Sequence, residues 1–316
     1  QGALLSGVQR NLGRISAVIC LVALLLSVVF SRALTRRMGT LLKAIRIVRE
    51  GEYSHRVQLG GHDELALLAD EFDQLTGRLQ TTEEVRRRFV SDASHELKTP
   101  LASIRLLTDS ILQSDHIDPE TSKEFVSDIG EEAERLTRIT EKLLTLTRMD
   151  NAAPVHTEPV DVKYVVEKVE HMLSPLAKAV DVALLCQLDE GCFVRATQDD
   201  IYQIAFNLME NAIKYNLPQG TVTVKLFVRG GSVMLRVEDT GVGIPKEDLP
   251  KVFDRFYRVD KARSREAGGT GLGLSIVRDT ARQHGGSVTV RRRDPDPGTC
   301  FEVVFPLCGP EGGSKL

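Results

Sequence analysis

The most apolar stretch of the chain runs from residue 15 to residue 31, between Arg14 and Arg32. Its length is close to the minimum of about 17 residues for a helix that crosses roughly 30 Å of hydrocarbon. We therefore expect one transmembrane helix, residues 15–31, after an extracytoplasmic stub of residues 1–14. A signal peptide is the alternative, but no small-residue cleavage pattern follows. Because more basic residues follow the stretch than precede it, we expect a cell-membrane protein with a single visible span and a cytoplasmic remainder.

Residues 32–83 show helical spacing with a break. Apolar residues recur at Leu41, Ile45 and Val48, and glycines interrupt the pattern near residue 60. A second apolar run then follows in alternating steps of three and four, through Leu65, Leu68, Phe72, Leu75 and Leu79. This pattern predicts two short amphipathic helices around a glycine-containing connector, with a plain coiled-coil spacer as the alternative.

Two longer amphipathic helices are expected in residues 84–150. The apolar stripe of the first comprises Phe89, Ala93, Leu97, Leu101, Ile104, Leu107 and Ile111, and that of the second comprises Phe125, Ile129, Leu136, Ile139, Leu143 and Leu146. Between them, Asp118 can cap the second helix and Pro119 suits its first turn. Two helices cannot enclose this apolar surface, so we expect a second copy of the hairpin to complete a dimeric four-helix bundle.

The pattern changes to mixed helix and strand in residues 160–308, after a linker at residues 151–159 and before a tail at residues 309–316. Strand composition is found at residues 222–228, 233–238, 287–290 and 300–305, and helical spacing at residues 162–173, 200–215 and 274–284. These elements predict an α/β sandwich. The expected fold is thus multidomain: a transmembrane helix, two α-helical regions and an α/β domain.

Composition narrows the function classes. Hydrophobic residues make up 42% and charged residues 27%, which is typical of globular protein and excludes wholesale disorder and a multi-span membrane protein. The net charge of −3 gives no basic field, so no direct nucleic-acid partner is expected. Five scattered cysteines without a C-x-x-C pair indicate neither a disulfide framework nor a zinc site. Because the chain begins at Gln1, we expect a fragment that lacks an N-terminal sensor region.

The first candidate for chemistry is the string from Ser94 to Pro100, inside the first long helix. A histidine on a helix is usually an ordinary polar residue of a solvated face. Here the apolar stripe turns His95 outward, and Pro100 removes a backbone hydrogen bond from a helix that continues past it. A zinc protease would need a second histidine where Thr99 stands. His95 is therefore a candidate nitrogen nucleophile, with Glu96 beside it to orient the ring and take its proton.

A second cluster lies near the end of the helix at residues 200–215. Asn207, Asn211 and Lys214 share one face, which could simply be a solvated face. Amide oxygens can also hold Mg²⁺, and a lysine can neutralise phosphate. Two glycine-containing loops follow at residues 239–244 and 268–274. Neither is a Walker A motif or a dinucleotide fingerprint, and glycine loops alone are weak signals.

Together these motifs resemble the two-component sensor histidine kinases. Residues 95–100 are similar to their phosphoacceptor box, and residues 84–150 then correspond to the dimerisation and phosphotransfer domain. Residues 32–83 resemble a HAMP linker, and Asp63 and Glu64 match that family. The chain departs from the family at two places: Met38 and Gly39 stand where a proline is usual, and Ala66 stands where a glycine is common. Residues 160–308 resemble the ATP-binding fold shared with gyrase and Hsp90.

The resemblance also implies roles for individual residues. The adenine amino group would donate to Asp239, Tyr215 would lie near the nucleotide, and Lys214, Asn207 and Asn211 would bind Mg-ATP, the two asparagines as metal ligands. Further cofactor-binding residues are implied in the two loops: Gly241, Gly243, Ile244, Gly269, Thr270, Gly271, Leu272 and Gly273. Residues 253–258 resemble the family's phenylalanine box, residues 259–267 a mobile lid, and Arg258 is the candidate for contacting the γ-phosphate.

Three functions are possible for a chain with these motifs. The first is a membrane histidine kinase that uses ATP and Mg²⁺ to phosphorylate His95 and passes the phosphate to an aspartate of a response regulator. Thr99 is implicated in the reverse activity, removal of the regulator's phosphate. The second is an ATPase of the same fold, but such enzymes carry a water-activating glutamate where this chain has Asn207, and an amide is no general base. The third is a degenerate scaffold, which would be expected to have lost one of the motifs.

Overall fold

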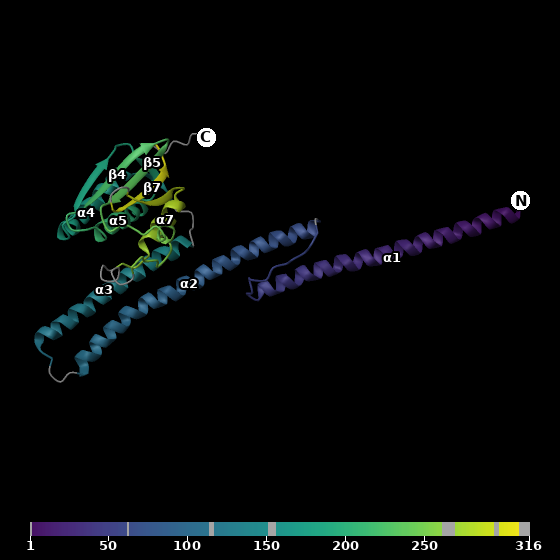
Figure 1. Ribbon diagram of the computed structural model, residues 1–316, viewed down its shortest axis with the longest axis horizontal. Coiled ribbons are helices and arrows are strands. Elements are labelled where there is room, and N and C mark those ends of the chain that lie inside the picture. The colour runs from purple at the N-terminus through teal and green to yellow at the C-terminus, as the bar shows by residue number, and fades with distance from the viewer. Residues whose placement is uncertain are drawn as a thin grey trace. The chain divides into compact units, whose positions relative to one another are not determined.

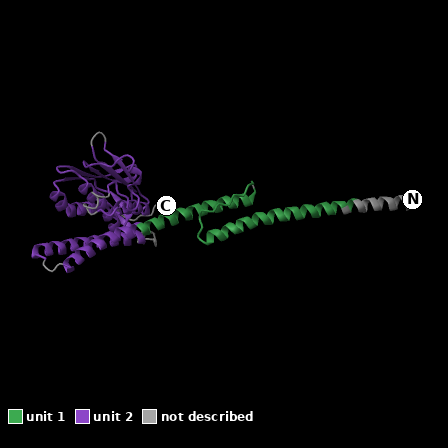
Figure 2. Cartoon of the chain, turned by 60° about the horizontal axis from the view of Figure 1, so that its bottom comes forward, with its two compact units in different colours: residues 1–91 green, residues 92–316 purple. Residues whose placement is uncertain are grey.

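The computed structural model describes residues 2–61, 63–113, 117–150, 156–260, 269–293 and 297–309. The chain divides into two compact units, residues 1–91 and residues 92–316 (Figure 2). Helix α2 (Glu64–Gln113) runs through the boundary between them, and each unit is described here separately.

Unit 1 begins with the single helix α1 (Gly2–Arg49), which joins the apolar stretch directly to the first amphipathic helix. Within the described part of the chain, one helix is long and apolar enough to cross a membrane, and it lies in Val18–Arg49. Its large apolar side chains are open to the surroundings, with Phe30 71% exposed and Leu26 65% exposed. Such a surface suits lipid contact rather than water.

The connector between α1 and α2 is held by carboxylates. Asp73 accepts hydrogen bonds from the Val57 backbone N–H at 2.8 and 3.0 Å, and this fixes the connector where Val57 packs against Ala44 and Ala69. Arg37 pairs with Asp63 and donates to the Gly60 carbonyl at 2.7 Å. The hydrogen bond from Arg37 is the first reason that the pKa of Asp63 lies below its usual value.

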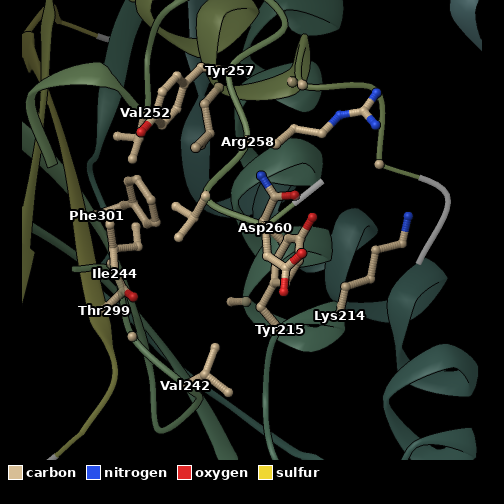
Figure 3. A pocket seen from close by; sticks show the side chains of 18 of the residues that line it. Lys214, Tyr215, Val242, Ile244, Val252, Tyr257, Arg258, Asp260, Thr299 and Phe301 are labelled. Atoms are coloured by element: carbon tan, nitrogen blue, oxygen red, sulfur yellow. The ribbon is translucent and has the colours of Figure 1, made fainter. Parts of the chain in front are cut away.

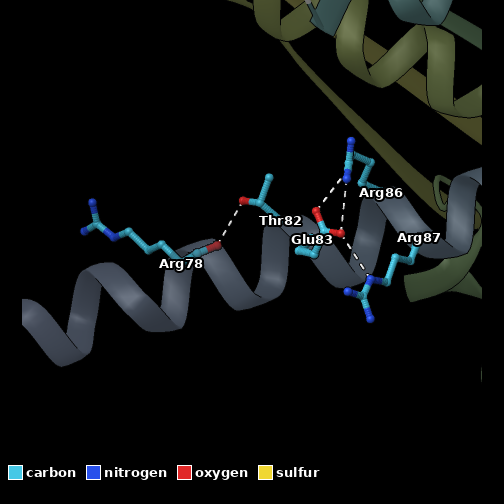
Figure 4. A network of polar contacts seen from close by, with 5 residues as sticks. All are labelled: Arg78, Thr82, Glu83, Arg86 and Arg87. Atoms are coloured by element: carbon cyan, nitrogen blue, oxygen red, sulfur yellow. Dashed lines mark hydrogen bonds and ion pairs between the residues drawn. The ribbon is translucent and has the colours of Figure 1, made fainter. Parts of the chain in front are cut away.

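Further along α2, residues 78–87 carry a network of polar contacts (Figure 4). Glu83 accepts from Arg86 at 3.0 Å and pairs with Arg87 at 3.1 Å, which are the three- and four-residue spacings of neighbours on a helix face. Thr82 donates to the Arg78 carbonyl at 2.9 Å. These local contacts support α2 as an uninterrupted helix through residues 78–87.

Unit 2 begins with the remainder of α2 and continues with α3 (Pro119–Asp150). The expected cap is confirmed, because Asp118 accepts from the backbone N–H groups of Glu120 and Thr121 at 3.1 and 2.9 Å. Some apolar positions are buried in the single chain, such as Ile139 and Leu146. Leu101 of the expected stripes is exposed and the other stripe positions are half-buried. Apolar residues outside the stripes are also exposed in the unit 2 part of these helices: Leu106, Leu112, Val126 and Leu144.

The α/β part of unit 2 is a two-layer sandwich (Figure 1). Its five-stranded sheet has the order β2-β4-β5-β7-β6, in which β2–β4 is parallel and the other pairs are antiparallel, and a two-stranded sheet pairs β1 with β3. The strands are β1 (Glu158–Asp161), β2 (Ala183–Leu188), β3 (Phe193–Ala196), β4 (Thr221–Arg229), β5 (Ser232–Asp239), β6 (Ser287–Arg292) and β7 (Thr299–Pro306).

Helices α4 (Val162–Ala179), α5 (Gln198–Lys214) and α7 (Gly273–Gln283) pack on the sheet, and the short 3-10 helix η1 (Leu249–Lys251) lies between β5 and α7 in the sequence. Alternate residues of β4 are buried beneath the helices: Val222, Val224 and Leu226. The structure differs from the expectation in that residues 158 and 159 belong to β1 rather than to the linker.

Candidate functional site

His95 lies on the surface of α2, as the apolar stripe predicts. Pro100 sits within this helix without ending it, and the Thr99 hydroxyl donates to the His95 carbonyl one turn earlier at 3.2 Å. Leu101, expected to face a core, is 54% exposed, because two helices of one chain cannot cover both apolar stripes. The histidine is thus accessible to a second reactant, and an apolar surface remains uncovered on the same helix.

The main cavity of unit 2 has a volume of about 640 Å³ and lies over α5, between the loops that follow β5 and those that precede α7. Figure 3 shows its two sides: apolar side chains, including Ile244 and Phe301, gather opposite the charged Lys214 and Arg258. An apolar slot joined to a cationic region suits a ligand that has a flat ring at one end and anionic groups at the other.

Asp239 is the buried carboxylate of the apolar side. Its Oδ1 accepts from the backbone N–H groups of Gly241 at 2.9 Å and Thr299 at 3.1 Å. These two N–H groups occupy Oδ1, and Oδ2 has lone pairs that can accept a hydrogen bond from a ligand. Burial raises the pKa of Asp239, against the lowering effect of the two N–H groups.

Close packing of the backbone requires glycine at two positions of the predicted loops. A Cβ on Gly241 would lie 2.2 Å from the Tyr215 carbonyl oxygen, so this residue sits beneath the site and donates to Asp239 instead of lining the cavity. Gly271 has φ +69° and would place a Cβ 2.8 Å from the backbone of Phe256. Leu272 also does not line the cavity, because its side chain is fully buried at the start of α7.

The predicted residues that do line the cavity are Asn207, Asn211, Lys214, Tyr215, Asp239, Gly243, Ile244, Arg258, Gly269, Thr270, Gly271 and Gly273. His95, Glu96 and Thr99 are not among its lining residues. Gly268 and positions 261–267 of the expected lid lie outside the described residues.

The two asparagines of α5 differ in their surroundings. Asn207 donates through Nδ2 to the Gln203 carbonyl at 2.7 Å, and its Oδ1 lies 2.6 Å from where a Cβ of Gly273 would be. Asn211 makes no side-chain hydrogen bond within the described residues. Since those residues contain no group of three His, Cys, Asp or Glu side chains placed to hold a metal, a cation here would need ligand and water oxygens besides an amide.

Arg258 lies at the cationic end of the cavity. Its side chain is 4% exposed, and its Nη2 donates to Glu96 Oε2 at 2.6 Å. Its Nε and Nη1 are buried and have no hydrogen-bond partner within the described residues. Buried guanidinium donors without partners are costly, so an anionic ligand fits this position.

Comparison with known proteins assigns domains to the chain. Three family models match in order along the chain: the HAMP domain at residues 29–81, the His Kinase A (phospho-acceptor) domain at residues 85–152, and the Histidine kinase-, DNA gyrase B-, and HSP90-like ATPase at residues 196–309. The chain thus carries three domains in the order that its resemblance to the two-component sensor histidine kinases implies.

The curated relatives of the chain include sensor histidine kinases. The chain is 30% identical to the sensor histidine kinase YkoH of Bacillus subtilis over 92% of its own length and 63% of that protein. It is 31% identical to the signal transduction histidine-protein kinase ArlS of Staphylococcus aureus over 89% of its own length and 62% of that protein. The chain thus spans less than two thirds of the relatives it matches.

Solved structures support the fold of the chain. The Acinetobacter baumannii histidine kinase AdeS is 25% identical, with a TM-score of 0.54, and the match covers 67% of this chain and 98% of that one. Histidine kinase ThkA, solved in complex with the response regulator protein TrrA, is 20% identical, with a TM-score of 0.59, over 73% of this chain and 66% of that one. At that identity, ThkA shows the fold alone.

The structure also brings residues to the site that sequence analysis missed. Lys142 of α3 lines the cavity, although it belongs to the phosphoacceptor hairpin. Thr299 supplies an N–H to Asp239 from β7. Tyr257 also lines the cavity, and its hydroxyl donates to Asp248 at 2.5 Å, which raises the Tyr257 pKa to about 12. The predicted strand at residues 300–305 lies next to Thr299 and was the only sequence feature that could have indicated it. No local sequence pattern indicates that Lys142 lies at the cavity.

Proposed function

We propose that the chain is a sensor histidine kinase that uses Mg-ATP to phosphorylate His95 and passes the phosphoryl group to an aspartate of a response regulator receiver domain. The observation that carries the proposal is the contact between Arg258 of the cavity and Glu96, the residue after His95. It joins the candidate nucleotide site to the candidate nucleophile within one unit of the structure.

The shape and charge of the cavity support ATP as the ligand. Asp239 Oδ2 can accept from the adenine amino group, because Oδ1 is occupied by backbone donors. Lys214 and the free nitrogens of Arg258 are the cations suited to the phosphates. Mg²⁺ would be held by Asn211, with Asn207 alongside, and would neutralise charge on the phosphate oxygens.

The chain's own residues then account for transfer. The unprotonated ring nitrogen of His95 attacks the γ-phosphorus; a nitrogen–phosphorus bond forms, the bond to the bridging oxygen breaks, and ADP leaves. The proton on the other ring nitrogen passes to the Glu96 carboxylate. Arg258 stabilises the charge that develops on the transferred group. ATP hydrolysis without transfer is disfavoured, because Asn207 stands where a water-activating glutamate would be needed.

Partners and location form part of the same proposal. The uncovered apolar residues of α2 and α3 support a homodimer, in which a second hairpin completes a four-helix bundle. The exposed apolar surface within Val18–Arg49 supports a membrane anchor. The excess of basic residues after residue 31 supports kinase domains in the cytoplasm. Thr99 on the exposed face beside His95 supports a second activity, dephosphorylation of the regulator.

Incubation of the full chain with γ-labelled ATP, followed by acid and alkali, tests the function. We expect label that is acid-labile and alkali-stable, as for a phosphoimidazole. His95→Gln should abolish labelling while ATP binding survives. His171→Gln is the matched control, because His171 is also an exposed helical histidine but lies on α4. ATP turnover without protein labelling would favour the ATPase alternative, and neither activity would favour a scaffold.

A further inference from the structure

We propose that Lys142 of the phosphoacceptor hairpin binds the nucleotide phosphates, so that α3 as well as the ATPase-like domain holds the bound nucleotide. This inference rests on the ATP site proposed above and adds to it a contact from outside the matched ATPase domain.

The position of Lys142 carries the inference. It lines the cavity together with Asn211, Glu210 and Lys214 of α5, on the side where α3 contacts α7. Lys214 already pairs with Glu210 at 2.9 Å, whereas Lys142 has no ion pair or hydrogen bond within the described residues. Within the described residues, Glu210 is thus already paired with Lys214, and the ammonium group of Lys142 has no direct contact with a carboxylate.

The surrounding charges favour an anionic ligand. Burial, first of all, lowers the pKa of Lys142; Lys214 and Arg138 lower it further, and only Glu210 opposes them. Because Glu210 is shared with Lys214, the net local charge stays positive. A phosphate group in the cavity would relieve the repulsion among these cations.

A phosphate contact from α3 would link nucleotide binding to the docking of the ATPase-like domain on α3, whereas a contact from α5 alone would not. If phosphates bind both α5 and α3, nucleotide binds more tightly when the ATPase-like domain is docked on α3 than when it is free. By thermodynamic linkage, bound nucleotide then favours docking by the same factor. Lys142 would thus couple nucleotide occupancy to the position of the domain against its own hairpin.

The competing view is that Lys142 only balances Glu210. The two views differ in their dependence on the ligand, because a structural lysine affects binding of every ligand alike, whereas a phosphate-binding lysine affects only phosphorylated ones. Adenosine and Mg-ATP therefore serve as matched probes.

The test measures the dissociation constants of Mg-ATP and adenosine for the full chain in detergent micelles, by competition with a fluorescent nucleotide. Lys142→Met should weaken Mg-ATP about fivefold and leave adenosine unchanged, whereas Lys142→Arg should stay near wild type. Lys123→Met is the control, because Lys123 is an exposed lysine of the same helix.

Hydrogen exchange gives a second readout. Mg-ATP should slow exchange in residues 138–146 of α3 in the wild type but not in Lys142→Met. An unchanged Mg-ATP dissociation constant in Lys142→Met would overturn the inference, as would equal weakening of both ligands. Failure of the wild type to bind Mg-ATP at all would instead contradict the proposed function, so the two failures are distinguishable.

Discussion

Arg258 Nη2 donates to Glu96 Oε2 at 2.6 Å, across 162 positions of sequence and with the arginine side chain almost fully buried. The same guanidinium lines the cavity and keeps two nitrogens without partners in the described residues. Arg258 is therefore shared between the carboxylate next to His95 and any anion in the cavity. With ATP bound as proposed, the Glu96 carboxylate would compete with phosphate for the charge of this arginine.

This competition predicts opposite effects of two substitutions on ATP affinity. Glu96→Gln removes the competing charge, so ATP should bind as tightly as in the wild type or more tightly, although His95 labelling falls because an amide cannot take the proton. Arg258→Lys loses the planar fork and should weaken ATP while slowing labelling about tenfold or more. Calorimetric ATP binding and single-turnover labelling measure the two effects. Weaker ATP binding in Glu96→Gln would show that the pair does not compete.

The environments of the two asparagines predict different outcomes for the same substitution. Asn211→Asp should leave the thermal midpoint within about 1 °C of the wild type, because Asn211 makes no side-chain hydrogen bond in the described residues, yet it should abolish Mg-ATP-dependent labelling. Asn207→Asp loses the donor to the Gln203 carbonyl, so its thermal midpoint should fall by about 3 °C or more. Calorimetric melting and labelling separate the cases. Near-normal labelling by Asn211→Asp would move the metal to Asn207.

The buried carboxylate of Asp239 predicts a pH-dependent change in the stability of the domain. Because burial raises its pKa in the folded state, its contribution to stability is fully present below the unfolded pKa and is lost as the pH rises through the raised value. At neutral pH the buried carboxylate therefore destabilises the domain. Asp239→Asn keeps an acceptor for Gly241 and Thr299 and removes the charge, so we expect a higher thermal midpoint at pH 7 than in the wild type.

The same variant should bind ATP at least about tenfold more weakly, because the amide would turn a donor toward the adenine amino group. Melting curves between pH 4 and pH 8, with ATP titrations at pH 7, test both halves of this prediction. The gain in stability should shrink toward acid pH, where the wild-type carboxyl is protonated. A destabilised variant at pH 7 would contradict the role assigned to burial.

Sequence pattern predicted the parts of the fold whose local signal is strong. The expected helix at residues 200–215 corresponds to α5 and the strand at residues 222–228 to β4, and the cap at Asp118 is confirmed. The short strands β1, β2 and β3 were missed, since runs of four to six residues carry little periodicity. Helix α4 continues past the predicted end at residue 173 and includes Pro175, because packing of its buried face outweighs the missing hydrogen bond.

The site was predictable only where its residues are neighbours in sequence. The asparagine helix and the glycine loops could be read as motifs, because their residues lie within a few positions of one another. The contact of Arg258 with Glu96 and the position of Lys142 in the cavity depend on how α2 and α3 meet the α/β domain, which no local spacing encodes. Gly241 and Leu272 were predicted from motif position to bind the ligand, and neither is among the residues that line the cavity.

Thr99 is expected to separate two activities at one helix face, the labelling of His95 and the dephosphorylation of the regulator. The Thr99 hydroxyl donates its proton to the His95 carbonyl at 3.2 Å, and its oxygen keeps lone pairs that can accept a hydrogen bond from water on the exposed face. A water held there would lie next to His95, on the surface that a regulator's phosphoaspartate must reach. A purely structural role would confine the hydroxyl to supporting the helix before Pro100.

Thr99→Ala should keep labelling of His95 within a few-fold of the wild type, because attack on ATP requires His95 and Glu96 and not this hydroxyl. It should lose most dephosphorylation of a purified phosphorylated regulator in the presence of ADP, because no side chain then positions the water. Thr99→Ser keeps the hydroxyl and serves as the matched control, with both activities retained. If Thr99→Ala loses both activities equally, the hydroxyl supports only the helix. Undiminished dephosphorylation would instead remove Thr99 from the mechanism.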